Sequence, residues 1–160
     1  MANPFVHVEL HTNDLARAKE FYSKLFNWKL QDMPMPGGGS YTMIDVGGGT
    51  GGGMMVSQAP GTPPHWMSYV GVDDIHAATR KAKDLGAKVV VDVTEVGQYG
   101  IMSVITDPTG ATVAMWQAKP HKKRTKSATN GAAPGVGAAP APPPAVPDSR
   151  SLDAGATIDR

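Results

Sequence analysis

Two side chains near the N-terminus are of types that could move a proton together. Residues Phe5 to Leu10 alternate apolar and polar side chains, which predicts a half-buried strand. The alternation places His7 and Glu9, followed by His11, on one face, with the apolar residues on the other. A neighbouring carboxylate raises the basicity of an imidazole, so His7 and Glu9 are a candidate proton-transfer pair. The alternative interpretation is a carboxylate near the strand rim and a histidine bonded to a neighbour.

The elements that position this pair belong to an internal repeat with an offset of 60 residues. The segment Asn13-Asp14-Leu15 aligns with Asp73-Asp74-Ile75, and an apolar stripe at helical spacing continues from both. Strand-like runs precede both helices, and Met54-Met55-Val56 aligns with Ala114-Met115-Trp116. Such a duplication indicates two copies of one supersecondary unit, neither of which buries its apolar face alone.

Each copy is interpreted as a βαβββ unit. In the first copy we expect strands at 5–10, 28–33, 41–46 and 54–56, with a helix that Thr12, Asn13 or Asp14 caps and that runs to about Phe26. In the second copy we expect strands at 66–72, 88–96, 100–106 and 112–117, with a helix at 74–85. The glycine-rich segment 47–53 is interpreted as a hairpin connection, because a phosphate loop needs a helix after it and a strand follows here.

Composition divides the chain into a domain, 1–118, with units at 4–57 and 65–117, and a tail, 119–160. The tail begins with the basic run from His121 to Lys126 and continues in Ala, Pro and Gly, so we expect it to be disordered. The chain has no cysteine, which excludes disulfides, thiolate metal sites and thiol nucleophiles. The domain has no basic face for nucleic acid and no apolar run of membrane-spanning length. We therefore expect a cytoplasmic protein that binds neither nucleic acid nor membrane.

The repeat and its motifs resemble the vicinal oxygen chelate superfamily, which includes glyoxalase I, extradiol dioxygenases, methylmalonyl-CoA epimerase and bleomycin-binding proteins. The resemblance rests on the duplicated unit, on the helix opening that runs from Asn13 to Phe21-Tyr22, and on the hairpin Asp107-Pro108-Thr109-Gly110. It covers roughly Pro4 to Gln117. It implies an α+β fold in which two tandem βαβββ units form a pair of curled, mixed β-sheet half-barrels around a cavity.

Enzymes of this superfamily usually hold a divalent metal in that cavity, through the first and last strands of each unit. By the family's spacing, those positions here are His7, Met54, Met67 and Ala114, which form two pairs under the repeat offset. Of these four, His7 alone offers a donor that suits a hard or borderline cation. The resemblance therefore implies a lost metal site, and we expect no metal or other cofactor.

The remaining cavity positions are mainly apolar. The repeat offset places Met67 and Tyr69 on the face that corresponds to His7 and Glu9, and Met54, Ala114 and Trp116 are expected to close the sheets. Such a pocket suits an organic molecule with an aromatic or acyl part. Tyr41 is interpreted as a rim residue, and His65 is assigned no role.

Two functions stay open. The first is a metal-independent protein that binds a small, partly apolar organic ligand, as bleomycin-binding relatives do. The second is a glyoxalase-like lyase or isomerase that uses His7 and Glu9, with or without a weakly bound divalent metal. The partner expected in both cases is a small organic molecule. The sequence does not decide between pairing of the units within one chain and an exchanged homodimer.

Overall fold

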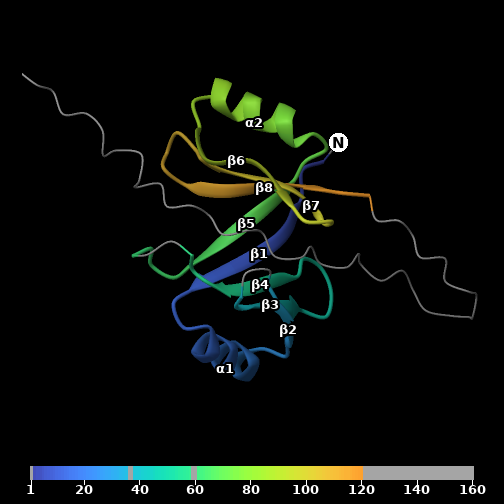
Figure 1. Ribbon diagram of the computed structural model, residues 1–160, viewed down its shortest axis with the longest axis vertical. Coiled ribbons are helices and arrows are strands. Elements are labelled where there is room, and N and C mark those ends of the chain that lie inside the picture. The colour runs from blue at the N-terminus through green and yellow to red at the C-terminus, as the bar shows by residue number, and fades with distance from the viewer. Residues whose placement is uncertain (1, 36–37, 59–60, 121–160) are drawn as a thin grey trace, which may run out of the picture.

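The computed structural model describes residues 2–35, 38–58 and 61–120, and these form two successive βαβββ units (Figure 1). The first unit consists of β1 (Phe5–Thr12), α1 (Leu15–Leu25), β2 (Lys29–Pro34), β3 (Ser40–Asp45) and β4 (Gly52–Val56). The second consists of β5 (His65–Gly71), α2 (Ile75–Asp84), β6 (Lys88–Val96), β7 (Gly100–Thr106) and β8 (Thr112–Ala118). The predicted α+β fold of two tandem units is confirmed, with element ends displaced by one or two residues.

The two helices begin in the same way, which supports the interpretation of a duplication. Asp14 caps α1 by accepting a hydrogen bond from the backbone N–H of Arg17 at 2.9 Å. Asp74, 60 positions later in the expected alignment, caps α2 by accepting one from Ala77 at 2.9 Å. A side-chain oxygen at this position satisfies an N–H group that the first helical turn leaves unpaired.

The strands form one mixed, eight-stranded sheet in the order β2-β3-β4-β1-β5-β8-β7-β6. Each unit contributes four consecutive strands, and the antiparallel pairing of β1 with β5 joins the units within the chain. Figure 1 shows α1 and α2 at opposite ends of this sheet. The first strands of both units therefore lie side by side at its centre.

Apolar residues form two clusters that the two units contribute separately. One cluster lies under α1 and contains Leu10, Ile44 and Met54, against which Leu15, Ala18 and Tyr22 pack. The second cluster is centred on the inner face of β5–β8 and contains Met67, Tyr69, Val91, Val96, Met102, Val104, Ala114 and Trp116. On the other side of β7, the buried hydroxyl of Ser103 contacts that of Thr79 from α2.

The strand register corrects the predicted position of Met54. In β1 and β4, Glu9 is opposite Gly53 and Leu10 is opposite Met54, so Met54 shares the face of Leu10 and not that of Glu9. In β5 and β8, Tyr69 is opposite Ala114. Gly53 is therefore the residue equivalent to Ala114. The repeat offset between β4 and β8 is one residue longer than the offset of 60 residues between β1 and β5. A slip of one residue exchanges the two faces of a strand, so the prediction that Met54 lines the inner face with His7 is wrong.

The predicted tail, 119–160, lies outside the described residues from position 121 onward. Within the described ranges, neither helix is long or apolar enough to cross a membrane.

Candidate functional site

The polar residues of β1 are buried together on the inner face of the sheet. The exposed fraction is 2% for His7, 0% for Glu9 and 5% for His11. Period-two alternation in β1 directs all three side chains to one side, and the pairing with β5 places Tyr69 opposite His7 and Met67 opposite Glu9. A carboxyl group with no exposure must be compensated by partners, which identifies Glu9 as the centre of the site.

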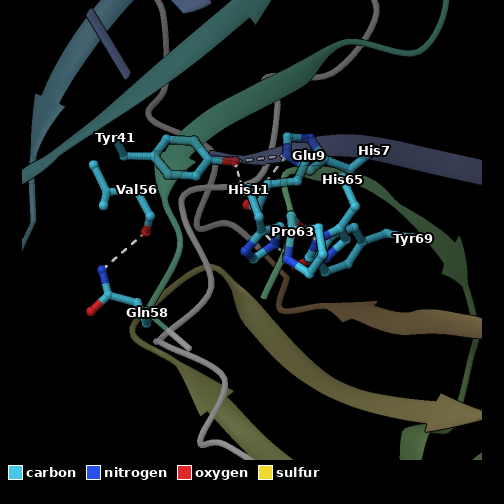
Figure 2. Close-up of polar contacts among 9 residues, drawn as sticks. All are labelled: His7, Glu9, His11, Tyr41, Val56, Gln58, Pro63, His65 and Tyr69. Carbon is cyan, nitrogen blue, oxygen red and sulfur yellow. Dashed lines mark hydrogen bonds and ion pairs between the residues drawn. The ribbon is translucent and has the colours of Figure 1, made fainter. Parts of the chain in front are cut away.

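Both oxygens of the Glu9 carboxylate have protein partners. Tyr41 Oη donates to Glu9 Oε2 at 2.8 Å, and Tyr69 Oη donates to Glu9 Oε1 at 3.0 Å. His11 Nε2 also lies 2.8 Å from Oε1, at an angle outside hydrogen-bond alignment. Figure 2 shows Tyr41 reaching toward Glu9 and His7 from one side, with His11 and Tyr69 on the other.

The hydrogen bond to Tyr41 determines which nitrogen of His7 carries the proton. Tyr41 Oη lies 2.8 Å from His7 Nε2, and its single proton is already donated to Glu9. His7 must therefore donate from Nε2, which leaves Nδ1 as a bare acceptor. This Nδ1 is buried and has no hydrogen-bond partner among the described residues. Among the described residues, the site thus presents a buried acceptor without a partner at His7 Nδ1, and His11 Nε2 is a second buried nitrogen without a hydrogen bond.

Burial keeps the His7 imidazole neutral. Desolvation lowers the pKa of His7 below its ordinary value of 6.5, and the negative charge of Glu9 opposes this shift without reversing it. The Nε2 atom lies 4.0 Å from Glu9 Oε2, so a proton taken up by His7 would be stabilised by that carboxylate. His7 is therefore a neutral base close to a charge that would stabilise its acid form.

The two tyrosine hydroxyls stay protonated over the physiological pH range. Desolvation, followed by the charge of Glu9 and the hydrogen bond to it, raises the pKa of Tyr41 and of Tyr69 well above 10. Both residues act here as hydrogen-bond donors to the carboxylate. The sequence predicts Tyr69 on this face, whereas it predicts Tyr41 at the rim. The signal that would have found Tyr41 is the β3–β4 register, which places it opposite Met55, two residues from Gly53.

A second feature missed from the sequence is a pair of histidines at the end of this face. His11 is directly opposite His65 in the β1–β5 pairing, and their rings are stacked with centroids 5.0 Å apart and planes at 5°. His65 is half-buried, and its Nδ1 donates to the backbone oxygen of Pro63 at 2.9 Å. The alternation of β1 together with the β5 register was the available signal.

The other residues predicted to bind a ligand are packed against one another. Met67, Tyr69, Ala114 and Trp116 all belong to the cluster on the inner face of β5–β8. Tyr69 contacts two of the predicted residues, because its hydroxyl bonds to Glu9 and its ring meets that of His7. Met54 lies under α1, on the opposite face of the sheet. The structure therefore brings together the two predicted acid–base residues and Tyr69.

The inner face does not fit the divalent metal that enzymes of the superfamily it resembles usually hold. Both Glu9 oxygens are bonded to tyrosine hydroxyls, and Gly53, Met67 and Ala114 offer no suitable donor at the remaining family positions. Within residues 2–35, 38–58 and 61–120, no three His, Asp or Glu side chains are grouped so that they could hold an ion.

Comparison with known proteins agrees with this fold. The model of the Glyoxalase/Bleomycin resistance protein/Dioxygenase superfamily matches residues 5–115. The chain belongs to this superfamily. A solved member of the same fold, methylmalonyl-CoA epimerase from Mycobacterium tuberculosis, is 17% identical with a TM-score of 0.58 over 72% of this chain and 88% of that one. A hypothetical protein from Bacillus halodurans C-125 superposes with a TM-score of 0.62 at 14% identity, covering 78% of this chain and all of that one.

Two groups of curated relatives differ in what they are named for. A putative glyoxylase, CFP32, from Mycobacterium bovis is 43% identical over 118 residues, which cover 71% of this chain and 45% of the relative. The anthracycline biosynthesis protein DnrV from Streptomyces peucetius is 29% identical over 123 residues, which cover 68% of this chain and 45% of that protein. The chain thus spans about half the length of these curated relatives.

Proposed function

We propose that this domain binds a small, partly apolar organic molecule on the inner face of the sheet, without a divalent metal. The observation that carries this proposal is the buried Nδ1 of His7, an acceptor without a partner among the described residues. An unsatisfied buried polar atom costs about 1–3 kcal/mol, so a donor that reaches it contributes to binding. A phenol or enol hydroxyl is such a donor, and it is attached to an apolar body.

The surroundings of His7 favour an aromatic or acyl body for this ligand. Tyr69 presents its ring edge-on to His7, with centroids 5.5 Å apart, and Met55 and Met67 lie on the same face. Methionine side chains rearrange at low cost, which lets a ligand displace them from a packed interior. The relatives named for anthracycline biosynthesis are consistent with an aromatic ligand.

Acid–base catalysis by a lyase or isomerase is the second candidate, and the hydrogen-bonded chain His7–Tyr41–Glu9 favours it. In this mechanism the bare Nδ1 of His7 removes a proton from a carbon next to a carbonyl group. The imidazolium formed is stabilised by the carboxylate of Glu9, and Tyr41 holds both groups in place. The relative named as a putative glyoxylase is consistent with this reaction class.

The test is calorimetric binding of a panel of phenols, naphthols and hydroxyanthraquinones in the presence of EDTA. We expect at least one compound to bind, and His7→Ala to weaken its binding about tenfold through loss of one hydrogen bond. His76→Ala, which changes an exposed histidine on α2, is the matched control and leaves binding unchanged.

Binding that requires an added divalent ion, or that is equally strong in His7→Ala, would contradict the proposal. Incubating the protein in D2O with compounds that carry a hydrogen on the carbon next to a carbonyl group, such as α-hydroxyketones and 1,3-diketones, separates the two candidates. Deuterium at a carbon atom, detected by NMR and lost in His7→Ala, identifies an enzyme; its absence leaves a binding protein.

A further inference from the structure

Five aromatic residues form a group of touching rings on the outer face of the sheet, which is the face that carries the helices. They are Phe21, Tyr22, Phe26, Trp28 and Trp66, and we call them the aromatic patch. The ring of Tyr22 joins α1 to β5, because it meets the ring of Trp66 with centroids 5.5 Å apart. Trp66 is opposite Leu10 in the β1–β5 pairing and shares its face, which is the face of α1 and not that of His7.

Three rings of the aromatic patch stay open to solvent in spite of these contacts. The exposed fraction is 56% for Phe21, 41% for Phe26 and 39% for Trp66. Single apolar residues are ordinary on a protein surface, whereas a contiguous group of them marks an interaction site.

The second unit shows that the fold does not need aromatic residues at the exposed positions of α1. Under the repeat offset, the position of Phe21 is taken in α2 by Lys81, and that of Phe26 by Gly86. Both of these residues are exposed, as is usual on the outer side of a surface helix. The same element is thus stable with solvated residues where α1 presents rings, which indicates that the rings of α1 contact something outside the folded unit.

We propose that the aromatic patch is the surface through which two copies of this chain associate around a two-fold axis. Leu25, which is 54% exposed and one helical turn from Phe21, extends the patch. With Leu25 included, its exposed apolar area is on the order of 400 Å², given the size of such side chains. A standard interface covers about 800 Å² on each partner, of which about 60% is apolar. The patch therefore has the size that the apolar part of a dimer interface needs.

The position of the aromatic patch leaves it accessible to a second copy. Helix α1 packs mainly against β2 and β4, and α2 packs mainly against β6, β7 and β8. Figure 1 shows the helices at opposite ends of the sheet, with β1 and β5 between them. The patch extends from α1 onto β5, beside the stretch of sheet that separates the two helices.

The charges at the rim of the patch favour a second copy over an unrelated partner. Glu20 and Lys24 form an exposed ion pair along α1, with their charged atoms 2.6 Å apart, next to Phe21 and Leu25 in the sequence. A two-fold axis perpendicular to α1 reverses the direction of the second helix, which brings Glu20 of one copy toward Lys24 of the other. The rim is thus complementary to itself, as an interface between identical surfaces requires.

The test is sedimentation velocity of the full chain over a series of concentrations. We expect a reversible dimer with a Kd in the micromolar range or below, which interfaces of standard size reach. Phe21→Lys introduces the residue type that α2 carries at the equivalent position, so the protein should fold. We expect this substitution to weaken dimerisation about a hundredfold or more, because it is present twice in a two-fold dimer and removes a central ring.

The matched control is Leu85→Lys, which makes a similar change at the end of α2, where the side chain is 69% exposed and lies outside the patch. This variant should dimerise as the wild type does. Trp66→Val is the second test variant: it removes the ring from β5 and introduces the residue type that β1 has at the equivalent position 6. We expect a weaker dimer with an unchanged circular dichroism spectrum.

Two results would overturn the proposal. One is a wild-type chain that stays monomeric at about 100 µM, far above a micromolar Kd. The other is a dimer that Phe21→Lys and Trp66→Val both leave intact, which would place the contact on another face. Because the patch faces away from His7, neither variant should change ligand binding, and this proposal fails separately from the proposed function.

Discussion

His7 shows how burial converts an ordinary side chain into a specific acceptor. Folding removes the imidazole from water, which disfavours its charged form, and Tyr41 fixes its proton on Nε2. The sequence predicted this residue and its neighbour Glu9 because strand alternation is a local property. The sequence did not predict Tyr41, since that contact crosses three strands and depends on their register.

The lowered pKa of His7 has a consequence for stability in acid. Below the ordinary pKa of 6.5 the unfolded chain binds a proton that the folded protein does not, so the free energy of unfolding decreases as the pH falls from that value toward the folded pKa. His7→Gln, which keeps a donor for Tyr41 and cannot titrate, is expected to flatten this decrease. Urea unfolding of both proteins at a series of pH values measures the effect.

The matched control for this prediction is His76→Gln, which changes an exposed histidine and should retain the wild-type pH dependence. An equal loss of stability in acid for His7→Gln and the wild type would contradict the assignment of a buried, neutral His7.

At the scale of elements, β4 marks the limit of what the repeat could predict. The helices and the outer strands were placed correctly because their periodicity and caps are encoded locally. The face of β4 was not, because the glycine-rich connection before it lacks any apolar pattern that would set the register. Gly53, and not Met54, faces inward, and the ring of Tyr41 passes directly over it.

This arrangement predicts that a larger residue in place of Gly53 destabilises the protein. A Cβ atom at this position would overlap the hydroxyl and ring of Tyr41, which is fully buried and held by Glu9 and His7. We expect Gly53→Ala to destabilise the fold by about 2 kcal/mol, through overpacking and the weakened hydrogen bonds. Thermal or urea unfolding measures this change.

A double-mutant cycle with Tyr41→Leu separates this contact from other effects of the substitution. The cost of Gly53→Ala should fall markedly when the tyrosine ring is absent. The same cost in both backgrounds would show that Gly53 is needed for its backbone and not for the passage of Tyr41.

At the scale of the whole molecule, the two units share a fold but not a chemistry. The first unit contributes His7, Glu9 and Tyr41 to the inner face, and the second contributes mainly apolar residues. Tyr69 is the polar contribution of the second unit, and it reaches Glu9 across the β1–β5 junction. The site therefore depends on the pairing of both units, which explains why a single unit would not carry it.

That dependence can be followed through the ionisation of Tyr41 and Tyr69. Because their pKa values are raised in the folded protein, the unfolded chain loses these protons above about pH 10 whereas the folded protein keeps them. Stability should therefore decrease as the pH rises above that value. The tyrosinate absorbance of these two residues should appear with unfolding, which circular dichroism follows in parallel.

Subtracting the titrations of Tyr41→Phe and Tyr69→Phe from that of the wild type isolates each hydroxyl. Ionisation of either residue while the circular dichroism is still native would mean that the junction between the units opens to solvent without unfolding, and that Glu9 is not sealed by its two tyrosines.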